Sequence, residues 1–369
     1  MTNLWISGQL IDGLGDGIPE DQGCRRLDVS GCFVTPGLFD LQVNGGKACN
    51  FWGDPLPQAV SELARDLAAV GVTSFLPTLI SDSLEKLKKN IAALEAAGVE
   101  HDRQQLKGSS GRNKSAPPPQ PVAGARPGNM RQARMPGIHL EGPFLSPERP
   151  GVHPREWIKP WSAELVSELV TENVLLVTLA PETETGHGAI QQLIERNIKV
   201  SLGHSNASFD QARSAFDQGI GLVTHTFNAL PPLHHRAPGA VGAALLDSRV
   251  SCCLICDGLH LDPAVVRLVV DAKGIAKTIL VTDAAQIGTS QGGLVGSSIT
   301  LDQAVRNVVG WAVTEFAGAV RMASYNPACA VGLEHQIGHL APGRQADVVV
   351  WHKDSLAIKH VILGGDLLF

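Results

Sequence analysis

Residues 198–226 read IKVSLGHSNASFDQARSAFDQGIGLVTHT, and this stretch decides the fold. The apolar run at 198–202 is typical of a buried strand, and residues 208–219 are typical of a helix. A second strand-like run follows at 221–224. The stretch therefore predicts a strand–helix–strand unit, from which sheets of parallel strands are built.

The same alternation extends in both directions along the chain. Strand-like runs precede helical ones at 72–98 and 174–197, and a further strand-like run, TILVTDAA, occupies 278–285. Buried strands rich in Val, Ile and Leu that alternate with helices predict an α/β fold, either a (β/α) barrel or a doubly wound sheet. One barrel of typical size plus a small satellite would use all 369 residues. We favour the barrel because of the polar residues at the strand ends.

Two parts of the chain depart from this alternation. Both chain ends contain short alternating strands with glycine turns, LWISGQLIDG (4–13) and IKHVILGGDLLF (358–369) among them, and predict β-structure. Residues from about 101 to 134 are rich in Gly, Pro, Ser and Arg, with almost no bulky apolar side chains. Such a segment cannot bury enough surface to order itself, so it predicts a flexible surface insertion. Because the segment is basic, an interaction arm is the alternative.

Composition limits the classes of function. Hydrophobic residues make up 44% and charged residues 18% of the chain, which predicts a globular core. A formal net charge of -6 argues against a broad nucleic-acid-binding surface, so an anionic ligand would need a local basic cluster. The N-terminus, MTNLWISGQLIDG, has no basic segment followed by an apolar one, and nowhere do about eighteen apolar residues run together. We therefore expect a cytoplasmic location and no membrane partner.

The seven cysteines do not predict a disulfide framework, because their number is odd and they are scattered along the chain. Cys253 and Cys256 form a CxxC pair in the strand-like run RVSCCLIC. Positions three apart on a strand point to opposite faces, and the sequence has no second CxxC pair. We expect most of the cysteines to be small buried apolar residues.

Four strand-like runs end on a residue that can bind a metal or move a proton: Glu141, His204, His225 and Asp283. In a parallel barrel the carboxyl ends of the strands converge on one mouth, so these side chains would lie close together. Two neutral imidazoles and one carboxylate are a standard set of zinc ligands with a fourth position open. A metal held there would lower the pKa of water toward about 7 and polarise a carbonyl.

Other interpretations of these residues are open. A single histidine at a strand end is often a hydrogen-bonded packing residue. Glu141, however, would be a costly buried charge without a partner. Asp283 follows a buried strand and precedes two alanines, so it could exchange a proton with water and the leaving amine. The alternative for Asp283 is the N-cap of a helix.

A local basic cluster occurs between residues 228 and 260. His234, His235, Arg236 and His260 lie in loop-like segments with Asn228 and several glycines. An arginine, histidine donors and exposed backbone N–H groups together suit a phosphate. Solvated surface residues are the alternative for His234 and His235.

A set of ordered motifs resembles the N-acetylglucosamine-6-phosphate deacetylases of the amidohydrolase superfamily. The motifs span most of the chain in the family's order: DLQVNG (40–45), HLEGPFL (139–145), GVH (151–153), GHSNAS (203–208), THTFNAL (224–230), DGLH (257–260), VTDAA (281–285) and GSS (296–298). The resemblance implies a distorted (β/α)8 barrel, at 36–338, and a small β-sandwich formed by residues 1–35 and 339–369. It also implies a homodimer.

The resemblance further implies a chemistry and a role for each matching residue. Glu141, His204 and His225 are similar to the family's metal ligands, and Asp283 to its catalytic acid/base. His153 is similar to a histidine that contacts substrate and helps to polarise the acetyl carbonyl. The implied reaction is hydrolysis of N-acetyl-D-glucosamine 6-phosphate to D-glucosamine 6-phosphate and acetate.

The implied phosphate site consists of Asn228, Ala229, Arg236 and His260, with the arginine reaching in from the neighbouring subunit. The implied cofactor is one divalent metal, with Zn²⁺ preferred and Fe²⁺, Co²⁺ or Mn²⁺ as alternatives.

The chain departs from the family pattern in three places. Many amidohydrolases carry His-x-His at the end of the first barrel strand, where this chain has Gln42 and Asn44. This difference predicts a single metal, with Gln42 as a contact for water or for a second site and His139 as a less favoured extra ligand. The segment between Asp283 and the GSS motif is shorter than expected, and the proline-rich insertion has no counterpart in the family core.

Two other functions remain open from the sequence. An N-acetylgalactosamine-6-phosphate deacetylase would differ only in how its loops recognise one hydroxyl group. A non-catalytic sugar-phosphate-binding paralogue would keep the phosphate cluster while the shortened segment impairs catalysis.

Overall fold

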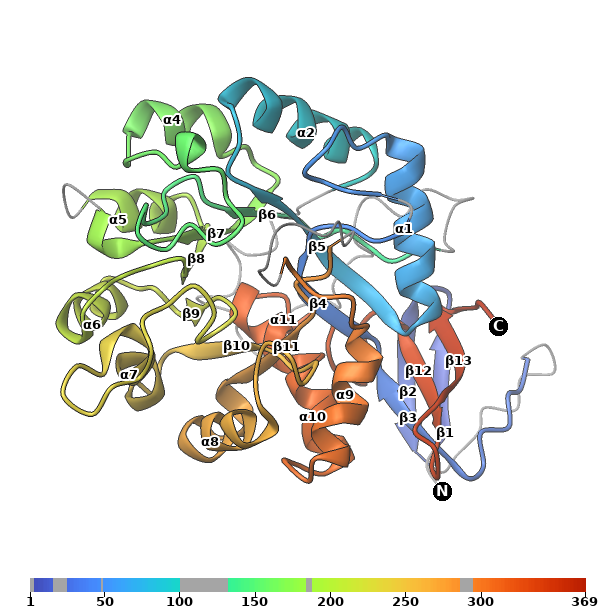
Figure 1. Cartoon of the computed structure of the whole chain (residues 1–369). Helices are drawn as coiled ribbons and strands as arrows, with labels where there is room; N and C mark the ends of the chain where they lie inside the picture. Colours follow the sequence, from blue (N-terminus) through green and yellow to red (C-terminus); the bar gives the residue numbers. More distant parts are fainter. Residues whose placement is uncertain (1–2, 16–24, 48, 100–131, 184–187, 286–294) are drawn as a thin grey trace, which may run out of the picture.

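The computed structural model describes residues 3–15, 25–47, 49–99, 132–183, 188–285 and 295–369. Its centre is one sheet of eight parallel strands (Figure 1). In sheet order these are β4 (Leu38–Val43), β5 (Val72–Ile80), β6 (Ile138–Glu141), β7 (Val174–Leu179), β8 (Lys199–Leu202), β9 (Leu222–Val223), β10 (Ser251–Ile255) and β11 (Thr278–Val281). The order in the sheet equals the order in the chain, as a barrel requires.

The first and last strands meet just beyond their carboxyl ends, which closes the barrel. Val43 forms a parallel bridge with Ala284, and the Asn44 N–H donates to the Ala284 carbonyl at 2.7 Å. Nearer the amino end of β4, the buried Asp40 carboxylate accepts from the Thr282 hydroxyl at 2.6 Å. The predicted (β/α)8 barrel is therefore confirmed.

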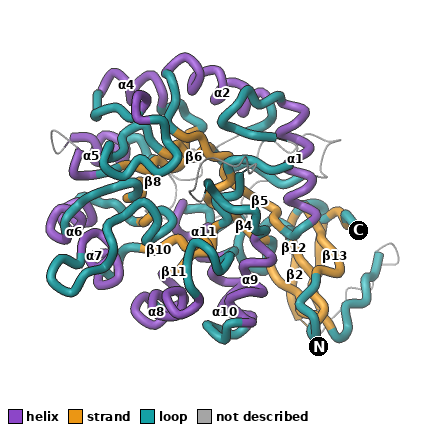
Figure 2. The backbone as a smooth tube through the Cα atoms, viewed as in Figure 1, coloured by secondary structure: helices purple, strands orange, loops and turns teal. Residues whose placement is uncertain are grey.

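Helices surround the sheet on its outer side (Figure 2). They are α1 (Pro57–Ala69), α2 (Leu84–Ala96), α4 (Ala163–Leu169), α5 (Gly188–Glu195), α6 (Phe209–Asp217), α7 (Gly239–Leu246), α8 (Pro263–Lys273), α9 (Leu301–Gly310) and α10 (Phe316–Met322). Short 3-10 turns lie at Arg155–Trp157, Pro181–Thr183 and Ile275–Lys277. Local sequence explains α6, in which Ser208 and Gln211 form a capping box and Ala212, Ala215 and Phe216 are buried.

Side chains alternate between two apolar layers along the barrel strands. Phe39 and Leu41 point into the barrel, whereas their neighbour Leu38 packs against the helix layer. A further helix, α11 (Tyr325–Val331), contacts β4 and β11 and contributes Ala328 and Val331 to the interior layer. The Asn326 amide donates to the Thr278 carbonyl at the start of β11, which places α11 at the amino ends of the strands. The carboxyl ends of the strands, at the opposite end of the barrel, are therefore free to hold the functional site.

The strands of both chain ends form two small antiparallel sheets beside the barrel (Figure 1). One pairs β1 (Asn3–Ser7) with β2 (Leu10–Gly15), and the other has the order β14 (Asp366–Leu367), β13 (Ile358–Leu363), β12 (Val348–His352) and β3 (Cys32–Pro36). Hydrogen bonds from the Ile11 and Ala346 amides to the Arg344 and Gln9 carbonyls connect the two sheets. The predicted small β-domain from both termini is confirmed, while its exact boundaries stay a prediction.

The predicted insertion falls mostly outside the described residues, which resume at 132. Its last two residues, however, belong to the barrel. Ala133 is buried, and the Arg134 backbone exchanges hydrogen bonds with Thr73 and Phe75 of β5. Including Ala133 and Arg134 in a flexible insertion was wrong, because their pairing with a distant strand cannot be inferred from the Pro- and Gly-rich residues that precede them.

The CxxC pair is structural, as the alternation along the strand predicted. Cys253 packs in the interior layer and Cys256 in the helix layer, and both are free and buried. Burial raises the pKa of both thiols, which opposes ligation or redox chemistry.

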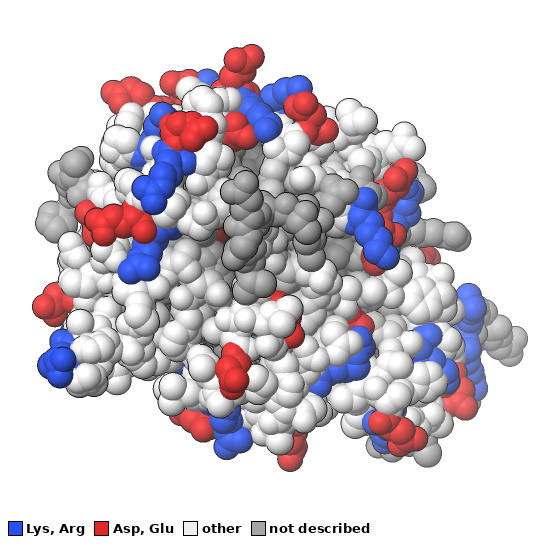
Figure 3. All heavy atoms as spheres, viewed as in Figure 1, with Lys and Arg blue, Asp and Glu red and all other residues white. Residues whose placement is uncertain are grey.

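Charged side chains of both signs interleave around the rim of the face drawn in Figure 3. Because the two signs are mixed, an anionic ligand on this face would have to be bound by individual donor groups rather than by a region of uniform positive charge. Among the described residues, no helix combines the length and apolar character needed to cross a membrane.

Candidate active site

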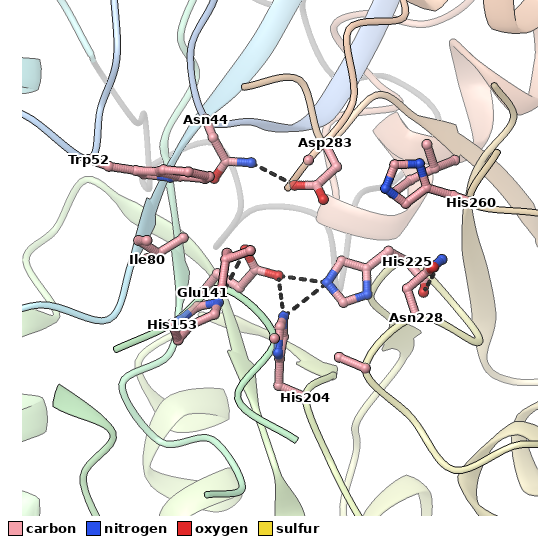
Figure 4. A pocket seen from close by; sticks show the side chains of 15 residues that line it. Asn44, Trp52, Ile80, Glu141, His153, His204, His225, Asn228, His260 and Asp283 are labelled. Carbon is pink, nitrogen blue, oxygen red and sulfur yellow. Dashed lines mark hydrogen bonds and ion pairs between the residues drawn. The ribbon is translucent and has the colours of Figure 1, made fainter. Parts of the chain in front are cut away.

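Four polar side chains converge at the carboxyl ends of the strands, as the sequence predicted. Glu141 is the last residue of β6, while His204, His225 and Asp283 each lie two residues beyond β8, β9 and β11. They line a pocket of about 140 Å³, shown in Figure 4. Three of the four have positive φ: 45° at His204, 28° at His225 and 50° at Asp283. Residues other than glycine rarely adopt this left-handed backbone conformation, and backbone strain of this kind concentrates at functional sites.

Glu141, His204 and His225 bring three ligand-type atoms together. Glu141 Oε1 lies 3.2 Å from His204 Nε2 and 2.9 Å from His225 Nε2, and the two nitrogens are 3.1 Å apart. Donor atoms that share a zinc at bonds of about 2.0 Å in a tetrahedron lie about 3.3 Å apart. The spacing and the chemical types of these three donors therefore fit a divalent metal.

His204 is oriented by a backbone carbonyl. His204 Nδ1 lies 3.0 Å from the Arg149 oxygen, and a carbonyl oxygen only accepts, so Nδ1 carries the hydrogen. In the neutral ring Nε2 then presents its lone pair to Glu141 and His225, as a ligand must. Close approach of the backbone requires glycine at 151, because a Cβ there would lie 2.8 Å from His204 Cε1.

His153 has the opposite tautomer. The Ser81 backbone N–H, which only donates, points at His153 Nδ1 over 3.1 Å. Burial and the neighbouring His204 lower the pKa of His153 to about 3, so the ring is neutral and its hydrogen is on Nε2. This buried Nε2 has no hydrogen-bond partner among the residues that the structure describes, and it lies 3.8 Å from Glu141 Oε2. His153 therefore directs an N–H donor toward the pocket.

The tautomers decide between two ligand sets. Glu141, His153 and His204 also place ligand-type atoms within 4.8 Å of one another. Because Nδ1 of His153 accepts from Ser81 and its Nε2 carries a hydrogen, His153 offers no free lone pair. The hydrogen-bonding geometry therefore favours His225 over His153 as the third donor of this group.

Gln42 supports the carboxylate of this group. Its amide Nε2 donates to Glu141 Oε1 at 3.0 Å, so Gln42 contacts this carboxylate directly. Burial opposes the ionisation of Glu141, but the nearby His204 and His225 rings outweigh it and hold the pKa of Glu141 well below its usual value. The carboxylate is thus kept in the charged form that a metal ligand needs.

Asp283 faces this group across the pocket and is held by two residues from the segment after β4. The Asn44 amide donates to Asp283 Oδ1 at 2.6 Å, and the Trp52 indole N–H donates to Asn44 Oδ1 at 3.2 Å. Burial and the charge of Glu141 raise the pKa of Asp283 to about 7. A carboxyl group with a pKa near neutrality can both take up and release a proton.

His139 lies beneath the site and is not a free ligand. Its Nε2 is 2.7 Å from the Thr178 hydroxyl and its Nδ1 is 3.0 Å from the Leu41 carbonyl. Burial lowers the pKa of His139 to about 4, so the ring is neutral. Both nitrogens are occupied in holding β6 to β7 and β4.

The predicted phosphate residues divide into two groups. Asn228, Ala229 and His260 line the pocket, and Figure 4 shows Asn228 and His260 on the side away from Trp52. His260 Nδ1 is 2.6 Å from Asp257 Oδ2, which fixes the ring. Arg236 is exposed, does not line the pocket of its own chain and donates to His235 Nε2 at 2.8 Å.

Several residues that shape the site were not predicted from the sequence. Asn44 was noted only as a missing histidine, and Trp52, Ile80, Ser81 and Arg149 were not singled out. Asn44 lies in the DLQVNG motif and Ser81 directly follows a strand, so their positions carried a signal. Their partners lie in other segments of the chain and could not be inferred.

Comparison with known proteins agrees with this geometry. Residues 123–368 match the model of the Amidohydrolase family. The chain is 32% identical to N-acetylgalactosamine-6-phosphate deacetylase of Escherichia coli O157:H7 over 90% of this chain and 87% of the relative. It is 31% identical to N-acetylglucosamine-6-phosphate deacetylase of Vibrio furnissii over 91% and 83%.

Comparison with a solved structure also indicates a relationship to these deacetylases. A mutant N-acetyl-D-glucosamine-6-phosphate deacetylase from Mycobacterium smegmatis, in complex with N-acetyl-D-glucosamine-6-phosphate, superposes with a TM-score of 0.82 at 28% identity. The match covers 100% of this chain and 94% of that chain. The chain therefore belongs to the amidohydrolase family, in the branch of the N-acetylglucosamine-6-phosphate deacetylases.

Proposed function

We propose that this chain hydrolyses N-acetyl-D-glucosamine 6-phosphate to D-glucosamine 6-phosphate and acetate. The observation that carries the proposal is one pocket that contains a three-donor metal-type group, the N–H donor of His153 and the proton-exchanging carboxyl of Asp283. These are the parts that metal-assisted amide hydrolysis needs. Relatives that cover most of the chain carry this activity in their names.

Glu141, His204 and His225 would hold one divalent metal, and zinc suits two imidazoles and a carboxylate best. Fe²⁺, Co²⁺ and Mn²⁺ are the alternatives. When bound, the metal supplies Lewis-acid polarisation of the carbonyl and a more acidic water. A single ion is favoured because Gln42 donates to Glu141 and Asn44 donates to Asp283, so neither amide is oriented as a second set of ligands.

His153 and Asp283 have separate tasks, which are stabilisation of the oxyanion and transfer of the proton. The His153 Nε2–H donates to the acetyl oxygen as negative charge develops on it. Asp283 accepts a proton from the attacking water and returns it to the amine nitrogen when the C–N bond breaks. Asn44 occupies Oδ1 of Asp283, which leaves Oδ2 for these transfers.

The sugar phosphate would extend toward Asn228, Ala229 and His260. These residues offer an amide, a loop backbone and an imidazole whose Nδ1 side is already paired with Asp257. Arg236 of the partner subunit would complete the site in a homodimer. In support, Arg236 is exposed and does not line the pocket of its own chain.

The homodimer has its own test. Mixed dimers of Arg236→Ala and Asp283→Asn proteins should regain activity that neither variant has alone, because each mixed dimer contains one intact site. If Arg236 acts within its own chain, the mixture stays as inactive as its components.

Acetate release is the primary test of the proposed function. Purified protein should release acetate from N-acetyl-D-glucosamine 6-phosphate, and Asp283→Asn should abolish turnover. The galacto epimer must be assayed in parallel, because the Escherichia coli relative is named for it. Release from neither sugar would favour the non-catalytic binding protein. The cytoplasmic location and the domain boundaries remain proposals.

A further inference from the structure

The pocket has an apolar surface whose carbon atoms have no role in the proposed chemistry. Trp52 and Ile80 line it next to Glu141 and His153 (Figure 4). Ile80 is the last residue of β5 and is 9% exposed, and it stands in register beside Glu141 on β6. Trp52 is half-buried and is held by its indole hydrogen bond to Asn44. We call Trp52 and Ile80 the apolar wall.

The polar side of the pocket lies opposite. His260 and Asn228 are beyond His225, away from the apolar wall (Figure 4). Sheet order gives the same separation, because β5 lies between β4 and β6 while His225 and His260 follow β9 and β10. Trp52 and Ile80 therefore lie on one side of the Glu141, His204 and His225 group, and Asn228 and His260 lie on the other.

An N-acyl amino sugar phosphate has the same two-sided character. On either side of its amide carbonyl lie a hydroxylated, phosphorylated ring and a small alkyl group. The carbonyl has to reach the metal group and the His153 N–H, so the alkyl group and the ring point in different directions. Burying the alkyl group against apolar side chains is favourable, whereas the ring hydroxyls and the phosphate need polar partners.

We propose that Trp52 and Ile80 form an acyl pocket that limits the length of the acyl group the enzyme removes. This inference rests on the proposed function and extends it to a specificity determinant. The alkyl group packs against the Ile80 side chain and the Trp52 ring. A longer chain meets Ile80, whose backbone is fixed by the barrel, and Trp52, whose ring is fixed through Asn44.

The test compares N-acetyl, N-propionyl and N-butyryl forms of the same amino sugar 6-phosphate. The wild type should lose about tenfold or more in kcat/KM for each added methylene, the usual discrimination of a hydrophobic pocket. Ile80→Ala should raise the propionyl-to-acetyl ratio of kcat/KM about tenfold, and Ile80→Val should give an intermediate ratio in case the alanine variant folds poorly.

Ile255 provides the matched control. It is buried, lines the same pocket and ends β10, which β4 and β11 separate from the Ile80 strand β5 around the closed barrel. Ile255→Ala removes the same atoms and should leave the propionyl-to-acetyl ratio within about twofold of wild type, whatever it does to turnover.

The outcomes separate this inference from the proposed function. If wild type releases acetate but neither Ile80 variant changes the acyl ratio, the acyl pocket is wrong and the proposed function stands. A changed preference between gluco and galacto epimers in Ile80→Ala, with an unchanged acyl ratio, would place the sugar ring at the apolar wall instead. If wild type releases no acyl product from any of these substrates, the proposed function itself fails.

Discussion

Two neighbouring histidines have opposite roles because one backbone atom fixes each of them. The rings of His153 and His204 are 4.4 Å apart between centroids. The Ser81 N–H makes Nδ1 of His153 an acceptor, and the Arg149 carbonyl makes Nδ1 of His204 a donor. Consequently one ring directs an N–H at the pocket and the other a lone pair.

Replacement of the two histidines should therefore give different results. His153→Gln should keep the metal and lower kcat by about 10²–10³-fold, the usual cost of removing a donor to a developing oxyanion. His204→Gln should lose the metal. Metal content by mass spectrometry, measured with acetate release, checks both. Metal loss in His153→Gln would instead support the ligand set Glu141, His153 and His204.

Asn44 sets the orientation and the proton affinity of Asp283. Its donated hydrogen bond favours the ionised carboxylate and so opposes the burial that raises the pKa of Asp283. Asn44→Ala should raise this pKa further, which moves the acidic limb of the kcat/KM profile to higher pH and lowers kcat about tenfold or more. Trp52→Phe should have a smaller effect in the same direction, because it removes only the partner of Asn44. An unmoved acidic limb in Asn44→Ala would contradict this role.

The polar residues at the ends of the barrel strands could be predicted from the sequence, whereas the contacts that orient their side chains could not. A mostly apolar strand-like run that ends at a charged residue identified Glu141 and Asp283, because buried parallel strands are rich in apolar side chains on both faces. The two-residue strand β9 was found for the same reason. The left-handed turn at His204 and the Ser81–His153 contact depend on loop conformation, which no local pattern specifies.

Asp40 joins the first and last barrel strands and should affect stability in a pH-dependent way. Burial raises the pKa of Asp40 to about 6, against the hydrogen bonds from Thr282 and Gln42. A raised folded-state pKa stabilises the fold at low pH and loses that contribution as the pH rises through about 6.

The prediction concerns the difference between wild type and Asp40→Asn. Between pH 4 and pH 7 the wild type should lose up to about 3 kcal/mol of unfolding free energy relative to Asp40→Asn. Urea unfolding of both proteins across this range measures the difference. Parallel curves would show that Asp40 titrates as it does in the unfolded chain.

At the scale of the whole molecule, one ion pair joins the barrel to the β-domain. Arg134, next to β5, pairs with Asp347, and its second nitrogen donates to Gln345 at 3.3 Å. Asp347 is buried and also accepts from the Gly364 N–H at 2.8 Å. The pair thus connects a barrel strand to the segment that enters β12.

Arg134→Ala should lower the unfolding free energy by about 1–3 kcal/mol, because it leaves a buried carboxylate without its cation. Lys88→Ala is the matched control. It breaks the exposed pair with Glu168, whose side chains are each 45% exposed, and should cost less than about 1 kcal/mol. Equal losses in the two variants would mean that Arg134 does not join the two parts.

The central claim is metal-dependent deacetylation at the Glu141, His204 and His225 group. The most direct measurement is acetate release from N-acetyl-D-glucosamine 6-phosphate by chelator-treated protein while Zn²⁺ is added back. Turnover should be absent without metal and reach a plateau at one equivalent of Zn²⁺ per chain. Full turnover by the metal-free protein, or none at any metal loading, would contradict the account.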